Sequence, residues 1–167
     1  MIGSKNFTRT LIVAGSLVAA SCVSAEEART SDAAVFVQKV GLSANFAPIV
    51  AAYISQTSTG QTVEEKCRAK MGNWLLDAIR IEWKAVGPSW NAGLEKAVTK
   101  TFEAEFLKDA KDKTADQLRL VFAEPETQKS LAAAIEQETA PLLADIVPNV
   151  SKRIFDDAFA DGCLQSG

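Results

Sequence analysis

Residues 62–86 read TVEEKCRAKMGNWLLDAIRIEWKAV, and this stretch decides the fold. On a helical wheel of about 100° per residue, one face is polar and consists of Lys66, Lys70, Asn73, Asp77, Arg80 and Lys84. The remaining arc is mostly apolar and is made up of Val63, Cys67, Met71, Trp74, Leu75, Ala78, Ile79, Trp83 and Val86. An apolar arc this wide predicts a central helix that packs against neighbours on two sides.

The rest of the chain is also helical in character from Ser31 onward, and no run alternates apolar and polar residues for long enough to predict a strand. We expect Gly87-Pro88 to end the central helix. Pro148 should kink or split the last helix, whose Phe155 and Phe159 should face inward. Further helices are expected over residues 33–40, 45–56, 90–110, 116–123, 126–138 and 142–160. The sequence therefore predicts an all-α fold, a compact orthogonal bundle of six or seven helices.

The first 25 residues have the three-part layout of a secretory signal peptide. Lys5 and Arg9 form a basic head, residues 11–20 are apolar, and small residues precede Glu26. The apolar run is about half of the roughly 20 residues that a transmembrane helix needs. We therefore expect cleavage after Ala25, export to the periplasm, a single helical domain over residues 26–167 and no membrane span. The alternative is a lipid anchor at Cys22, because residues 19–22 (AASC) loosely resemble a lipobox without its leucine.

Removal of residues 1–25 leaves two cysteines, Cys67 and Cys163. An even number of cysteines in an oxidising compartment predicts a disulfide, which would join the end of the chain to the central helix. Two separate buried thiols and an intermolecular bridge are the alternatives.

The composition narrows the classes of function. The chain has no histidine, so Ser–His and Cys–His nucleophiles and imidazole zinc sites are excluded. No phosphate-binding loop or Cys-x-x-Cys motif occurs, and we expect no catalytic residue, no cofactor and no metal. The exported chain has 16 bases against 21 acids, a net charge of −5, and no basic cluster. That balance does not favour nucleic acid or an anionic membrane surface as a partner.

Two sets of side chains in the central region are candidates for function. Trp74, Trp83 and Trp90 lie within 17 residues and could form a binding surface, although core packing is the commoner use of tryptophan at helical spacing. Glu64 and Glu82 point toward the apolar arc, where a buried carboxylate could act as a general acid. The structural alternative pairs Glu64 with Arg68 and gives Glu82 a hydrogen-bond donor on a neighbouring helix.

Residues 114–129 read TADQLRLVFAEPETQK, and Thr114 and Gln117 have the spacing of a capping box. The stretch resembles the signature of an exported bacterial family catalogued as domain of unknown function 2059, with Thr-x-x-Glu-Leu, an aromatic pair and Ser-Pro-x-Gly-Gln-Lys. The residues that match are Thr114, Leu118, Phe122, Pro125, Gln128 and Lys129. Gln117, Glu124 and Thr127 depart from that pattern. The resemblance implies a periplasmic helical fold and no particular activity.

The missing catalytic groups and the wide apolar helix faces together predict a periplasmic protein that binds another protein, as an assembly factor, inhibitor or envelope-stress component. One alternative is a cell-wall hydrolase that uses two carboxylates roughly 5–9.5 Å apart in a cleft. The other is a carrier of a hydrophobic small molecule, which requires a closed cavity of at least about 300 Å³.

Overall fold

The computed structural model describes residues 32–164, and all of its regular elements are helical. A first helix covers Asp32–Val40. It is followed by η1 (Leu42–Asn45, a 3-10 helix), α2 (Phe46–Gln56), α3 (Ser58–Thr101), α4 (Ala104–Asp109), α5 (Ala115–Val121) and α6 (Pro125–Ala160). The predicted all-α fold with one disulfide is confirmed. The predicted signal peptide, and the lipid-anchor alternative at Cys22, lie outside the described residues.

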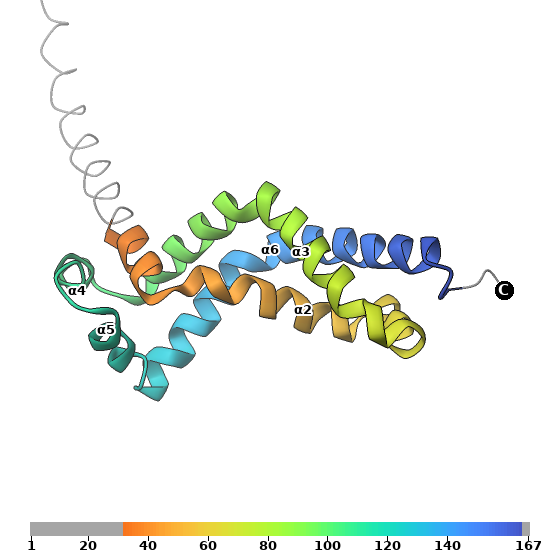
Figure 1. Ribbon diagram of the computed structural model, residues 1–167. Helices are drawn as coiled ribbons and strands as arrows, with labels where there is room; N and C mark the ends of the chain where they lie inside the picture. The colour runs from red at the N-terminus through yellow and green to blue at the C-terminus, as the bar shows by residue number, and fades with distance from the viewer. Residues whose placement is uncertain (1–31, 165–167) are drawn as a thin grey trace, which may run out of the picture.

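Two long helices, α3 and α6, run antiparallel and form the framework of the fold (Figure 1). At one end Lys70 of α3 pairs with Asp161, which follows α6. At the other end Lys100 Nζ donates to Glu138 Oε1 at 2.5 Å, and this hydrogen bond lowers the pKa of the Glu138 carboxyl. Between these pairs the two helices bury apolar side chains against each other, and α2 packs beside them against both.

The expected helix ends at Gly87-Pro88 and before Pro141 are wrong. Pro88 lies inside α3, and Pro141 and Pro148 lie inside α6; both helices are visibly bent (Figure 1). A proline removes one backbone hydrogen bond and bends a helix, but it ends the helix only where nothing holds the next turn. Here the next turns carry fully buried side chains, Trp90 after Pro88 and Val150 after Pro148. Their packing keeps each helix continuous.

Helix α3 also ends earlier than the predicted helix over residues 90–110, at Thr101. Phe102 and Glu103 are extended, and α4 begins at Ala104. This extended link lets the Phe102 ring stack on Phe106, with ring centroids 4.9 Å apart. The Phe102 ring also approaches the Phe36 ring of the first helix, at 5.1 Å between centroids. Phe122, after α5, completes this aromatic cluster at 5.7 Å from Phe36. The cluster joins the first helix to the segment that contains α4 and α5.

Lys39 of the first helix makes a second, polar connection to the segment that contains α4 and α5. Its ammonium donates to the backbone carbonyls of Ala110 (3.3 Å), Lys111 and Lys113 (3.0 Å). These carbonyls belong to the turn after α4, in which the Ala110 carbonyl also accepts from the Lys113 backbone N–H at 3.3 Å. One cation on the first helix therefore satisfies the turn that leads from α4 to α5. The predicted capping box at the start of α5 is confirmed, because Thr114 Oγ1 and the Gln117 side chain accept reciprocally from backbone N–H groups.

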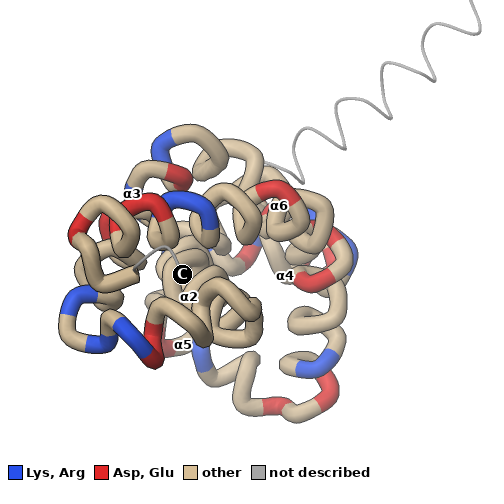
Figure 2. Tube along the Cα trace, turned by 90° about the vertical axis from the view of Figure 1, so that its right-hand side faces the viewer, with Lys and Arg blue, Asp and Glu red and all other residues tan. Residues whose placement is uncertain are grey.

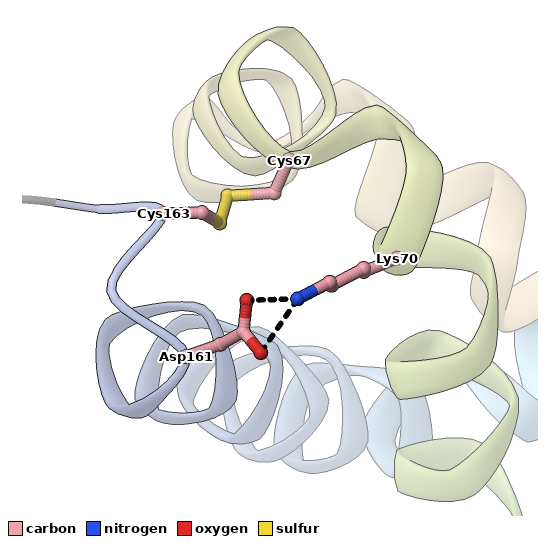
Figure 3. The surroundings of a disulfide bond; sticks show 4 residues. All are labelled: Cys67, Lys70, Asp161 and Cys163. Carbon is pink, nitrogen blue, oxygen red and sulfur yellow. Dashed lines mark hydrogen bonds and ion pairs between the residues drawn. A yellow bond between two sulfur atoms is a disulfide. The ribbon is translucent and has the colours of Figure 1, made fainter.

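The predicted disulfide between Cys67 and Cys163 is confirmed, with the two Cα atoms 5.9 Å apart (Figure 3). Cys67 interrupts the helical geometry of α3, with φ −125° and ψ 23°. Beside the disulfide, the Lys70 ammonium donates to both carboxylate oxygens of Asp161, at 2.8 and 2.6 Å. The end of the described chain is therefore held to the start of α3 by a covalent bond and an ion pair.

The expectation that Phe155 and Phe159 face inward is wrong, because their side chains are 45% and 52% exposed. In the last turns of α6 the fully buried side chains are Ile154 and Ala158. A helix that packs on one side only leaves its opposite face in solvent, and the two phenylalanines lie there.

In residues 32–164, no single helix has both the length and the apolar content required to cross a membrane; the bent pair Asp32–Val40 and Leu42–Gln56 meets that test only when its two members are combined.

The disulfide closes a long loop, with its two cysteines 96 residues apart, so its loss should lower the free energy of unfolding by about 4.7 kcal/mol in the chain-entropy model. Thermal unfolding followed by circular dichroism, with and without reductant, measures this effect. The Cys67→Ser, Cys163→Ser double variant is the control, because reductant should not destabilise it further. Equal midpoints for the oxidised and reduced wild type would contradict the prediction.

Candidate binding groove

An open apolar groove lies between the η1–α2 corner and the middle of α3. Its volume is about 420 Å³, within the range of known ligand and peptide sites. The residues that line it are Ser43, Ala44, Phe46, Ala47, Leu76, Ile79, Arg80 and Trp83. On α3 they follow the spacing i, i+3, i+4 and i+7, which places them on one face of the helix. We refer to this site as the α2–α3 groove.

Phe46 and Trp83 meet in this groove from opposite walls. Phe46, the first residue of α2, is almost fully buried, and its ring centroid lies 4.9 Å from that of Trp83 and 5.0 Å from that of Trp90. On its other side, the Trp83 ring lies against Gly87, one turn later in α3. A Cβ at Gly87 would lie 3.1 Å from the nearest indole atom. The half-buried indole of Trp83 is thus held between an aromatic ring and a bare stretch of helix backbone.

The polar groups of the groove lie at its edge. Ser43 Oγ donates to Asn91 Oδ1 at 2.7 Å, which ties η1 to α3. Arg80 is the one charged residue in the lining, and its guanidinium pairs with Asp77 Oδ1 at 2.9 Å. Both side chains of this pair are well exposed, at 70% and 64%, and such surface pairs contribute little to stability. Arg80 can therefore turn toward a carboxylate on an occupant of the groove at small cost.

The three tryptophans predicted as a binding surface do not form one. Trp83 lines the α2–α3 groove, and Trp74 is half-buried outside its lining. Trp90 is fully buried, so its assignment to a surface is wrong. Phe46 covers the Trp90 ring, and the Trp90 Nε1 has no hydrogen-bond partner. The sequence reasoning missed Phe46 and Leu76; the i, i+3, i+4, i+7 spacing of residues 76–83 was the signal that could have identified Leu76.

The two candidate carboxylates also differ from each other. Glu82 is buried, at 6% exposure, and its Oε1 accepts from Arg153 Nε of α6 at 3.2 Å. This contact is the donor on a neighbouring helix that the structural interpretation predicts. Glu64 is exposed, so its predicted burial is wrong. The reason is the break at Cys67: a wheel drawn from Asp77 loses its phase there and misplaces the residues before it.

Two open grooves bear on the alternative functions. A second open groove, of about 390 Å³, lies between α2 and α6 and is lined by Tyr53, Ala140, Leu143, Ala144, Val147 and Pro148. No aspartate or glutamate lines either groove, so neither has the acid pair that a glycoside hydrolase needs. Both are open to solvent rather than closed, as a carrier cavity would be. Within residues 32–164, no group of three or more potential ligands could hold a metal ion.

No family model, no curated protein and no solved structure matches the chain.

The contact between Gly87 and Trp83 predicts different effects on stability for two similar substitutions in α3. Gly72→Ala should stabilise the protein by about 0.5–1 kcal/mol, because its Cβ would meet nothing within 4 Å and alanine favours the helix. Gly87→Ala should lose that gain and shift the tryptophan emission, because the Trp83 ring must move away from the added methyl group. Chemical unfolding followed by tryptophan fluorescence measures both effects. Equal stabilisation by the two variants would show that Gly87 does not position Trp83.

Proposed function

We propose that this chain is an exported periplasmic protein that binds another protein through the α2–α3 groove. The observation that carries the proposal is the exposed apolar wall of this groove. Leu76 is 58% exposed beside Ile79 and the half-buried indole of Trp83. Apolar surface of this kind gains free energy when a partner removes it from water.

The chemistry of the groove favours an amphipathic helix or a short apolar segment of the partner. Such segments place two or three apolar side chains in a groove between helices. Arg80 at the edge would face an acidic side chain of the partner, and no lining acid would repel it. Lysine and arginine are interspersed with acidic residues along the described chain (Figure 2), so the remaining surface offers a partner both signs of charge.

Export is supported by the layout of residues 1–25 and by the disulfide, since disulfides persist in oxidising compartments. The resemblance of residues 114–129 to domain of unknown function 2059 would place the chain among exported bacterial helical proteins. A binding role is also supported by the complete absence of histidine from the chain, which leaves few routes to nucleophilic or acid–base catalysis.

Leu76→Glu should abolish capture of the partner, because a carboxylate would replace the most exposed apolar side chain of the groove. Affinity purification from a periplasmic extract, with bound proteins identified by mass spectrometry, measures capture. We expect a loss of about tenfold or more, the effect of removing one hot-spot residue. Leu120→Glu is the matched control, because Leu120 is 72% exposed on α5 and does not line the groove.

A partner captured equally well by wild type and Leu76→Glu would contradict this site. The purified partner gives a second readout, because covering the Trp83 indole should change its fluorescence emission on titration. That change should disappear in Trp83→Phe, in which Trp74 and Trp90 remain as reporters of any other event.

Export predicts that the protein recovered from the periplasm begins at Glu26, which the intact mass will show. The reason is that cleavage requires small residues, here Val23-Ser24-Ala25, before the cut. Ala25→Phe should block this processing. A mass that includes residues 1–25 in the wild type would contradict the prediction, and a lipid-modified Cys22 would establish the anchored alternative.

A further inference from the structure

The outer face of α6 carries an apolar stripe that the α2–α3 groove does not use. Its members are exposed and follow one another at spacings of four or seven residues: Ala140, Ala144, Pro148, Phe155 and Phe159. Such spacings keep side chains on one helix face. Three of these residues, Ala140, Ala144 and Pro148, also line the second groove, whose other wall is Tyr53 of α2. The stripe therefore consists of an apolar groove followed by two projecting aromatic rings.

A ring and a groove on the same helix cannot fill one another. Phe155 lies seven residues beyond Pro148 and eleven beyond Ala144, or about 10 and 16 Å along the helix axis. A phenylalanine side chain cannot span that distance back along its own helix. A second molecule that presents the same face in the opposite direction can place its ring in the groove.

We infer that the stripe is a docking surface for a second copy of this chain, with the two α6 helices packed antiparallel about a two-fold axis. Phe155 of each copy inserts into the second groove of the other, between Tyr53 and the α6 residues that line it. Such an interface is self-complementary, since every contact is made twice.

The charges of α6 fit the same register. If the two-fold axis passes between Pro148 and Asn149, Phe155 faces residue 142 of the second copy, at the level of the groove residues Ala140, Leu143 and Ala144. The same axis sets Lys152 opposite Asp145 of the second copy. Lys152 and Asp145 are both exposed, and at seven residues apart they lie on the same flank of the helix. Within its own helix Lys152 pairs with Asp156 at 2.5 Å, but this exposed pair contributes little to stability, so the Lys152 ammonium can turn toward Asp145 of the second copy. The same register therefore places each Phe155 ring at the level of the second groove of the other copy and sets Lys152 opposite Asp145 twice, once in each direction.

This inference does not depend on the proposed function. The second groove shares no lining residue with the α2–α3 groove, so a variant of Phe155 leaves Leu76 and Trp83 unchanged. Loss of self-association and loss of partner capture are separate outcomes.

Sedimentation equilibrium of residues 26–167, which contain every described residue, tests the inference. We expect a monomer–dimer equilibrium that Phe155→Ala weakens by about tenfold or more, the effect of removing a central aromatic side chain. Phe155 is exposed, so its truncation leaves the core intact. Leu120→Ala, at an exposed leucine on α5, should leave the equilibrium unchanged.

The charge pairs give a test of register. Asp145→Lys alone and Lys152→Asp alone each place like charges opposite each other in a homodimer, and each should weaken self-association severalfold at low salt. In an equimolar mixture of the two variants, every Lys faces an Asp again. The mixture should therefore form a heterodimer at concentrations where neither variant forms a homodimer.

Pro148→Cys provides a covalent readout, because this position lies next to the proposed two-fold axis. Mild oxidation should convert the variant to a disulfide-linked dimer, whereas Glu126→Cys, at the other end of α6, should stay monomeric. A wild-type protein that sediments as a monomer at all concentrations would overturn the inference. So would a dimer that Phe155→Ala leaves intact, or one in which the mixed charge variants associate no better than either alone.

Discussion

The antiparallel packing of α3 on α6 is the constraint on which the rest of the structure depends. Their shared face is apolar over most of its length, and its buried carboxylate, Glu82, is bonded to Arg153 across the interface. A buried carboxylate without a partner is costly, so this hydrogen bond favours the arrangement of the two helices in which Arg153 reaches Glu82. Helix α2 then covers further apolar side chains of both, while Leu76 of α3 and Phe155 and Phe159 of α6 stay exposed. The first helix and the α4–α5 segment extend this framework through the aromatic cluster and the three carbonyl contacts of Lys39.

Features encoded by neighbouring residues were predictable from the sequence. Thr114 and Gln117 form their capping box from a spacing of three residues, and Gly41, with φ 76°, ends the first helix where expected. The pairing of Cys67 with Cys163 followed from the number of cysteines that export would leave. Features decided by tertiary packing were not predictable in this way. Pro88 would have ended an isolated helix, and the buried Trp90 two residues later keeps α3 continuous.

The candidate site shows the same limit. A helical wheel identified Trp83 but could not distinguish it from Trp90. Phe46, which is distant in the sequence, packs on both rings, yet Trp90 is fully buried while Trp83 stays half-buried beside the groove. Glu64 was misplaced because a wheel assumes regular geometry, and Cys67 departs from it. Both errors have one cause. An apolar arc indicates that other segments will pack on a helix, but the arrangement of those segments determines which side chains stay exposed.

The position of the disulfide also gives the α2–α3 groove a mechanical asymmetry. The wall formed by Leu76, Ile79, Arg80 and Trp83 belongs to the ring of chain closed by Cys67 and Cys163, whereas the wall formed by residues 43–47 lies outside that ring. A pulling force on the chain ends cannot lengthen the ring while its covalent bond is intact. The same force can detach η1 and α2 without breaking any covalent bond. Under tension the groove would therefore lose one wall while the other stays in place.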